Sequence, residues 1–194
     1  MRKIFSYKWF TDDMAVYISF LRGINVAGHA SITMKQLVEA YCSLSLKHVQ
    51  THLQSGNVVF ESQGSNVEVL GKKLENAIEQ KTGLKVGVII RTPAHIKWVL
   101  DNNVFRIKEK NEALYVTFLS CVPEASLVKN IDRTAFIPDE FCVVKDQIFL
   151  YCPNGYGRTK LSNVFFERKL KCVGTTRNWN TINAVYELAG KKRG

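Results

Sequence analysis

The chain has 194 residues, of which 46% are hydrophobic, and a formal net charge of +10. This composition suffices for one substantial core or for two small cores that share an interface, and it excludes a chain that is disordered in bulk. No apolar run approaches the roughly 20 residues of a membrane span, and the basic segment 1–13 lacks the apolar stretch of a signal peptide. We therefore expect a cytoplasmic protein without a membrane partner, with residues 1–13 as an N-terminal extension.

The first part of the chain alternates strands and helices. Apolar, β-rich runs predict strands at 15–21, 48–54, 57–61 and 85–91, with a two-residue hairpin turn at Ser55-Gly56. The first strand has apolar residues on both faces and is expected to be central in its sheet.

Two helices lie between these strands. Capping boxes at Thr33 with Gln36 and at Ser65 with Glu68 predict their starts, and Gly83 predicts the end of the second helix. The resulting order, β-α-β-β-α-β, is that of a ferredoxin-like unit.

The same order returns in the second part of the chain, after a helix that starts at Thr92-Pro93 and runs through Leu100. There we expect strands at 113–120, 140–145 and 147–152, a short extended piece at 172–176, and helices at 123–130, 160–171 and 180–189. The predicted fold is α/β (α+β), with two ferredoxin-like halves packed as one compact unit. Residues 14–92 form the first half, 93–112 a connecting helix and loop, and 113–194 the second half with an extra C-terminal helix.

Cysteines and histidines give no sign of a metal or disulfide framework. The five cysteines are odd in number, widely spaced and without a CxxC motif, so we expect reduced thiols that act as small buried hydrophobes. The four histidines are scattered, and no serine elbow, HExxH motif or acidic pair occurs. No metal or cofactor is expected, and no catalytic residue is assigned.

Four clusters of polar residues stand out instead, because donor-rich side chains on turns are typical of sites for anions and polar ligands. The clusters are Arg22-Gly23-Ile24-Asn25, Gln54-Ser55-Gly56-Asn57, Tyr156-Gly157-Arg158-Thr159-Lys160 and Arg177-Asn178-Trp179-Asn180. The candidate ligand-binding residues are Arg22, Gly23, Asn25, Gln54, Ser55, Asn57, Tyr156, Arg158, Lys160, Asn163, Arg177 and Asn178.

Topology predicts which clusters meet. In a ferredoxin-like unit, the end of the first strand and the turn between the second and third strands lie at the same edge of the sheet. The Arg22 loop should therefore lie beside the Gln54 turn. The segment that begins at Tyr156 should open a helix, where free N–H groups and the helix dipole favour an anion.

Each cluster also has a structural interpretation. Asn25 could bond its own backbone, the Ser55-Gly56 pair could be a plain hairpin turn, and Thr159 could be a helix N-cap. In the last cluster, Trp179 should pack where the halves meet, and either Asn178 or Asn180 should cap the final helix, which leaves Arg177 as the candidate for an external anion.

These clusters also carry a resemblance. The strings LRGIN-V-x-G, QSGNVVF, YGRTKLSN and TTRNWNT occur in this order, and the chain from about Met14 to Gly190 resembles the bacterial domain-of-unknown-function family 1697. The resemblance implies a small cytoplasmic α/β protein and supports the choice of these residues without supplying a mechanism. One departure is Ala27, where the family commonly has a second glycine.

Charge adds a hint about the ligand. Residues 154–194 contain nine basic and two acidic residues, a local excess of seven within the total of +10. Such a patch attracts phosphates and polyanions, although it could also be a solvated basic face. The sequence thus favours a protein that binds a phosphate-bearing small molecule or nucleic acid. The alternatives are a metal-independent enzyme for a small anionic substrate, and polar clusters that serve only to join the halves. The oligomeric state is left open.

Overall fold

The computed structural model describes residues 14–25, 31–63, 66–108 and 110–191. The predictions for the segment 1–13, for the family departure at Ala27 and for Ser65 lie outside these residues. Within the described part, no helix combines the length and the hydrophobicity that a membrane crossing requires.

The first sheet is antiparallel and has the strand order β2-β3-β1-β4. Its strands are β1 (Ala15–Leu21), β2 (Lys47–His52), β3 (Asn57–Ser62) and β4 (Val88–Arg91), and its helices are α1 (Met34–Cys42) and α2 (Val67–Thr82). β1 and β2 both pair antiparallel with β3 and therefore run in the same direction, as predicted.

The second sheet repeats this arrangement, with the order β6-β7-β5-β8. Its strands are β5 (Leu114–Leu119), β6 (Glu140–Val144), β7 (Gln147–Tyr151) and β8 (Gly174–Asn178), and its helices are α4 (Ala125–Lys129) and α5 (Asn163–Leu170). The predicted mixed fold with two ferredoxin-like halves is thus confirmed. The division of the chain at 92 and 112 stays a prediction.

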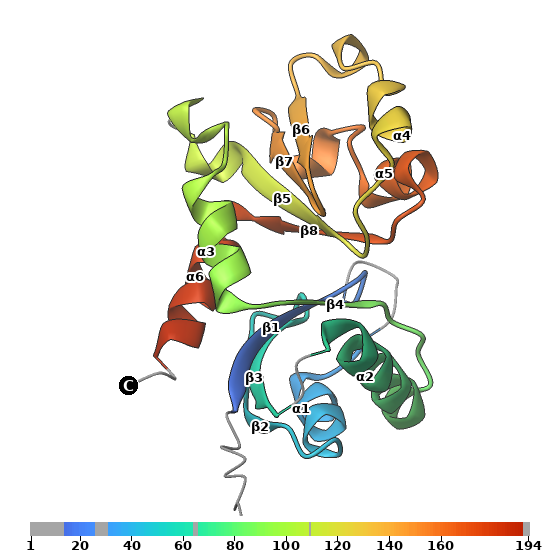
Figure 1. Ribbon diagram of the computed structural model, residues 1–194, viewed down its shortest axis with the longest axis vertical. Coiled ribbons are helices and arrows are strands. Elements are labelled where there is room, and N and C mark those ends of the chain that lie inside the picture. The colour runs from blue at the N-terminus through green and yellow to red at the C-terminus, as the bar shows by residue number, and fades with distance from the viewer. Residues whose placement is uncertain (1–13, 26–30, 64–65, 109, 192–194) are drawn as a thin grey trace, which may run out of the picture.

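Three cores hold the layers together (Figure 1). α1 and α2 cover the outer face of the first sheet, and α4 and α5 cover the outer face of the second. The inner faces of both sheets share one core with α3 (Pro93–Asp101) and α6 (Trp179–Gly190), which lie side by side. Trp179 is buried in this shared core, as predicted from the sequence.

Helix caps follow the sequence at most ends. Thr33 forms the predicted capping box with Gln36, and Gly83 ends α2 in the left-handed conformation with φ +73°. α2 begins directly after Asn66, whose side chain accepts the N–H groups of Glu68 and Val69. Thr92 caps α3 with Pro93 at its first position.

Two further boundaries differ from the predictions. The connection between β2 and β3 is a four-residue turn over residues 53–56 rather than a two-residue turn. The helix predicted from residue 160 starts only at Asn163, because Ser162 accepts the Phe165 N–H and Tyr156–Arg158 form a separate 3-10 turn. Thr159 is therefore not a helix cap.

The prediction of five reduced, buried cysteines is wrong. Cys121 and Cys172 form a disulfide, with Cα atoms 5.7 Å apart and a separation of 51 positions in sequence. Cys42 is exposed and Cys142 is half-buried, so only Cys152 fits the expectation of a buried free thiol. The disulfide joins the end of β5 to the start of β8, a proximity that sequence spacing does not reveal.

The two halves repeat each other's hydrogen bonds where they meet. β1 and β5 are equivalent strands, and the last residue of each and the residue after it form the same two backbone hydrogen bonds within their own half. The matching bonds run from Leu21 N to Gly56 O and from Leu119 N to Asp146 O, both 2.8 Å, and from Arg22 N to Gly87 O (2.9 Å) and from Ser120 N to Val173 O (2.8 Å).

The side chains repeat as well. Phe20 and Phe118 stack on each other with ring centroids 4.5 Å apart and an angle of 5° between their planes. The guanidinium of Arg177 lies over Phe20, and that of Arg91 lies over Phe118, at 5.5 and 5.7 Å. Because each half reaches into the other in the same way, the junction has the reciprocal character of a twofold interface. The structure therefore reveals an internal structural repeat, which we call the internal duplication.

Candidate functional site

The first two polar clusters converge as the topology predicted. The side chain of Asn25 donates to Gln54 O (2.8 Å) and Ile32 O (2.9 Å) and accepts the Ile32 N–H (2.8 Å). Asn25 has φ +54°, a left-handed conformation that asparagine tolerates better than most residues. Its side chain therefore ties the loop after β1 to the β2–β3 turn.

Arg177 lies at the centre of this convergence and is only 8% exposed. Its guanidinium donates to Asn57 Oδ1, Thr175 Oγ1 (2.8 Å), Thr176 O (2.8 Å), Leu21 O (2.7 Å), Ser55 O (2.8 Å) and Gly56 O (3.3 Å). Burial lowers the pKa of Arg177 to about 10. All three of its nitrogen atoms donate inside the protein, so the role of Arg177 as a receptor for an external anion finds no support in this geometry.

Asn57 completes the same network from the start of β3. It is fully buried, and its side-chain amide donates to His52 O (2.8 Å) and Ser55 Oγ (3.0 Å) while its oxygen accepts from Arg177. Gln54 and Ser55 lie in the exposed part of the turn. The turn thus presents Gln54 to solvent and directs Asn57 inwards.

Arg22 also binds within the chain, and its partner comes from the other half. Its guanidinium forms a two-point contact with Glu167 of α5, at 2.5 Å to Oε1 and 2.6 Å to Oε2. The hydrogen bond to Glu167 raises the pKa of Arg22. Gly23, beside it, is exposed with φ +67°, and a Cβ atom there would meet no other atom within 4 Å.

The third cluster divides into buried and exposed parts. Tyr156 Oη lies 3.0 Å from Thr176 Oγ1, which in turn donates to Asn163 Oδ1 at 2.6 Å. Burial raises the pKa of the Tyr156 phenol, so its hydroxyl keeps its proton at neutral pH. Tyr156 and Asn163 therefore connect the segment before α5 to β8.

Arg158 and Lys160 are exposed on the other side of this segment. They line one hollow of about 310 Å³, which we call the Arg158 hollow. The rest of its wall consists of Ala135, Phe136, Ile137, Pro138, Asp139 and Asn154. This hollow combines two cations with one carboxylate, of Asp139, and an otherwise mainly apolar wall.

Asn178 has a structural role at the start of α6. Its side chain accepts the Thr181 N–H at 2.7 Å, so Asn178 rather than Asn180 caps the helix. Of the two alternatives that the sequence offers, the structure thus selects Asn178.

A second polar group, which was not among the predicted clusters, lies where the halves meet. Arg91 donates to Leu119 O (2.6 Å) and lies 2.9 Å from Asp146 Oδ2, while His95 Nε2 lies 3.0 Å from Gln147 Oε1. Arg91 directly precedes the cap of α3, as Arg177 precedes the cap of α6. This shared arginine-cap-helix order was the signal in the sequence that could have identified Arg91.

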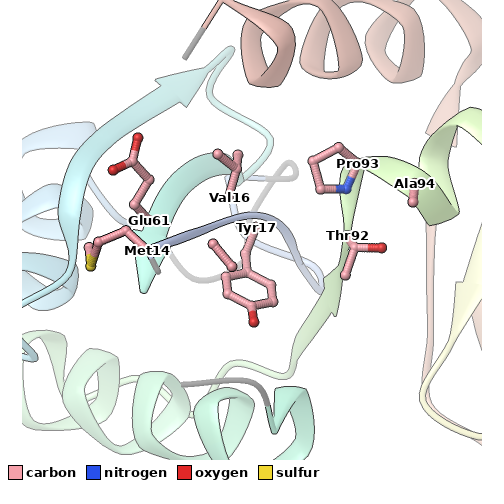
Figure 2. A pocket seen from close by; sticks show the side chains of 8 residues that line it. Met14, Val16, Tyr17, Glu61, Thr92, Pro93 and Ala94 are labelled. Atoms are coloured by element: carbon pink, nitrogen blue, oxygen red, sulfur yellow. The ribbon is translucent and has the colours of Figure 1, made fainter. Parts of the chain in front are cut away.

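A further hollow lies away from all of these clusters. Figure 2 shows Met14 and Glu61 on one side of it and Thr92, Pro93 and Ala94 on the other, with Val16 and Tyr17 of β1 between them. Its volume is about 540 Å³, and none of the predicted site residues lines it. In the described ranges, no group of three His, Cys, Asp or Glu side chains could hold a metal ion.

Comparison with known proteins places this geometry in a family. A search of curated proteins gave no significant match. Among solved structures, the chain is similar to the conserved bacterial protein SP0830 from Streptococcus pneumoniae, with a TM-score of 0.67 and 22% sequence identity. That similarity covers 91% of this chain and 99% of the other, and at this identity it shows the fold alone. The profile of the family described as "Protein of unknown function (DUF1697)" matches residues 14–149, more than half of the chain. The chain therefore belongs to this family, whose function is unknown.

Proposed function

We propose that the protein binds a phosphate-bearing ligand, a nucleotide or a nucleic acid, in the Arg158 hollow. The observation that carries the proposal is that Arg158 and Lys160 are exposed on the wall of one hollow. Arg22 and Arg177, in contrast, donate to oxygen atoms of the same chain. Among the cations of the polar clusters, this leaves Arg158 and Lys160 for an external ligand.

The wall of the hollow suits such a ligand chemically. A guanidinium and an ammonium group bind phosphate oxygens through charge-assisted hydrogen bonds. Phe136 and Pro138 offer apolar surface to a base or a sugar, and the amide of Asn154 can donate to and accept from a polar edge. The local excess of positive charge in residues 154–194 supports the same choice.

For most of the other candidates we infer a structural role. Asn25, Asn57 and Arg177 fix the loops of the first half against β8, and Arg22 joins the halves through Glu167. This matches the alternative in which polar clusters join the halves. No contact among the described residues favours the enzymatic alternative.

The test is a binding titration with the double variant Arg158→Ala/Lys160→Ala. Nucleotides and short RNA and DNA oligonucleotides are titrated into the wild-type protein and the variant at low salt. The matched control is Arg168→Ala/Lys169→Ala, which removes the same charge from exposed positions of α5 that do not line the hollow. We expect at least a tenfold weaker affinity for the first variant and a change of less than threefold for the control.

Equal losses in both variants would mean that general charge, rather than the hollow, attracts the ligand. Absence of binding by the wild-type protein at low salt would refute the proposal. A steep fall of affinity with salt would identify a polynucleotide, because neutralised phosphates release counterions, and a shallow fall would identify a small ligand.

We also propose the cytoplasmic location that the sequence suggests. Cytosolic thiols are normally kept reduced, so the Cys121–Cys172 disulfide stands against this location unless the pair is reduced in the cell, and its redox state there provides a test. Rapid alkylation at lysis followed by mass measurement should find both thiols modified. A pair that resists alkylation in native cells would argue for an oxidising compartment.

A further inference from the structure

The internal duplication allows the two edges of the junction to be compared position by position. The backbone contacts described above make Ser120 the equivalent of Arg22, and Asp146 the equivalent of Gly56. Glu75 of α2 is the equivalent of Glu167 of α5, because each accepts the N–H of the first residue of the edge strand that follows its helix. These equivalences reveal where the two edges differ.

At the edge formed by β8, the guanidinium of Arg22 binds the carboxylate of Glu167. Glu167 Oε1 accepts the Gly174 N–H at 2.9 Å and Arg22 Nε at 2.5 Å, and its Oε2 accepts Arg22 Nη2 at 2.6 Å. The arginine approaches from the end of the first strand of the opposite half. This edge therefore holds its own cation, bound at two points.

At the edge formed by β4, the equivalent guanidinium is missing. Glu75 Oε1 accepts the Val88 N–H at 3.1 Å, and among the described residues the hydrogen-bond partner of Oε2 is Lys72 at 2.8 Å, three residues earlier on the same helix. Ser120 is too short to reach as Arg22 does. A hollow of about 770 Å³ opens here, lined by β4, by α2 from Val67 to Asn76, and by Ser120 and Asp146. We call it the Glu75 hollow.

The two edges also differ in the number of guanidinium groups relative to carboxylates. The edge at β8 has two guanidiniums, of Arg22 and Arg177, for the one carboxylate of Glu167. The edge at β4 has one guanidinium, of Arg91, for the two carboxylates of Glu75 and Asp146, and the rest of the hollow adds the carboxylate of Glu68 and the ammonium groups of Lys72 and Lys73. An aspartate replaces a glycine and a serine replaces an arginine, so both changes favour a cation from outside.

We propose that the Glu75 hollow binds a guanidinium group, which contacts Glu75 at two points as Arg22 contacts Glu167. The source is either a free guanidinium compound or an arginine side chain of another protein, since the recognition chemistry is the same. Lys72 must leave Glu75 when the ligand binds. Its side chain is 79% exposed, and ion pairs between exposed groups at this helix spacing are weak and easily exchanged.

The shape of a guanidinium group is the reason for proposing it, rather than a simple amine, as the ligand of the Glu75 hollow. Its planar fork matches both oxygen atoms of a carboxylate, whereas an ammonium is a point charge that Lys72 already supplies. Asp146 contributes negative potential at the same hollow while its Oδ2 stays with Arg91 at 2.9 Å. This site is separate from the Arg158 hollow, which binds the opposite charge.

The experiment follows the backbone amides of α2 and β4 by NMR during titration at low salt. The probes are agmatine, a tripeptide Gly-Arg-Gly, the amine cadaverine and the neutral analogue Gly-citrulline-Gly. We expect agmatine, the arginine peptide or both to shift these amides with saturation. Cadaverine should bind at least tenfold more weakly, and the citrulline peptide should not bind.

Two variants locate the binding. Glu75→Gln keeps an oxygen for the Val88 N–H but removes the charge, and it should weaken binding at least tenfold. Ser120→Arg rebuilds the equivalent of Arg22 and should abolish binding by filling the hollow, which gives a second readout if Glu75→Gln is poorly folded. The control Glu167→Gln should not change the affinity.

Each result of the titrations leads to a different conclusion. Saturation by agmatine alone assigns the site to a free compound, and saturation by the peptide alone assigns it to a protein arginine. Equal binding of cadaverine and agmatine, unchanged binding in Glu75→Gln and Ser120→Arg, or no shifts with either guanidinium probe would overturn the proposal.

Discussion

Arg177 shows how a single residue can organise distant segments of a chain. A buried cation is costly unless its donors are all satisfied, and here the acceptors are carbonyl, hydroxyl and amide oxygens rather than a carboxylate. The carbonyls of Leu21, Ser55 and Gly56 come from the end of β1, where the next loop begins, and from the β2–β3 turn of the opposite half. The arginine therefore fixes both loops at once.

Arg177→Lys should consequently destabilise the protein, by about 3–5 kcal/mol, because a lysine cannot reach all these acceptors and leaves several of them buried without a donor. Urea denaturation measures the loss. The exposed Arg158→Lys serves as the control and should leave the midpoint unchanged. A variant at Arg177 that is as stable as the wild-type protein would show that this network contributes no net stability.

His95 makes stability depend on pH. Burial, followed by the nearby charge of Arg91, lowers its pKa below the value of 6.5, while Asp146 and Gln147 act in the opposite direction and Lys145 adds to the lowering. The unfolded chain therefore binds a proton at His95 more readily than the folded protein does. As the pH falls through 6.5, this difference favours unfolding.

The free energy of unfolding should thus fall between pH 7.5 and 5.5, and the fall should be smaller in His95→Gln. Urea titrations of both proteins at the two pH values provide the comparison. An identical pH dependence in the two proteins would exclude His95 as its source.

Sequence reasoning succeeded for residues whose role is local and failed for those with distant partners. Thr33 and Gln36 meet three residues apart, so their capping box is readable in the sequence. Asn57, a partner of Arg177, lies 120 residues away in sequence. The sequence alone does not distinguish an arginine that binds such a distant residue from one that binds a ligand. The candidate site was therefore found as a set of residues, but not as an inward-facing network.

At the scale of elements, the β2–β3 turn depends on Gly56. It has φ +74°, and an added Cβ would lie 2.7 Å from Leu21 Cβ and 2.8 Å from Ile24 Cδ1. Gly23 has a similar φ of +67° but open space around it. Comparing substitutions at Gly23 and Gly56 therefore separates the energetic cost of a left-handed conformation from the cost of the steric clash of an added Cβ.

Gly23→Ala should cost about 1–2 kcal/mol through its left-handed conformation alone, and Gly56→Ala should cost clearly more because backbone and core must also shift. Thermal denaturation of the two variants gives the comparison. Equal losses would mean that the turn relaxes around the new methyl group without strain.

The start of α6 offers a second comparison between neighbours. Asn178→Ala should cost about 1 kcal/mol, because the Thr181 N–H loses its acceptor. Asn180→Ala changes an exposed position inside the helix, where alanine is the better helix former, and should be neutral or slightly stabilising. Chemical denaturation distinguishes them, and a larger loss for Asn180→Ala would contradict the assignment of the cap.

Most elements were predictable because their apolar periodicity is strong. The start of α5 was not, since Thr159 and Ser162 are both good cap residues and only the structure shows that Phe165 N–H is bound by Ser162. Local propensity places such a boundary within a few residues, and tertiary packing decides it.

For the whole molecule, the shared core should make unfolding a single event. Phe20 and Phe118 are both fully buried and stack across the junction, so neither half is packed without the other. Phe118→Ala should destabilise the protein by about 3–5 kcal/mol and should speed hydrogen exchange in β1 as well as in β5. Exchange that rises only in the second half would show that the halves unfold independently.

The fold class was predictable from the order of elements, whereas the way in which the halves join was not. The contacts between Arg177 and Leu21 and between Cys121 and Cys172 join residues that no periodicity relates. The contact between Arg177 and Leu21 is repeated by Arg91 and Leu119, and this repetition became visible only when equivalent hydrogen bonds could be compared.

The duplication has a consequence for how the protein can change over generations. In a symmetric dimer of one half, a single codon specifies both copies of a position, so a substitution at one edge is imposed on the other. Once both halves lie in one chain, Arg22 and Ser120 are inherited separately, and so are Gly56 and Asp146. One edge can then keep the closed contact that holds the molecule together, while the other is free to diverge without cost to its twin.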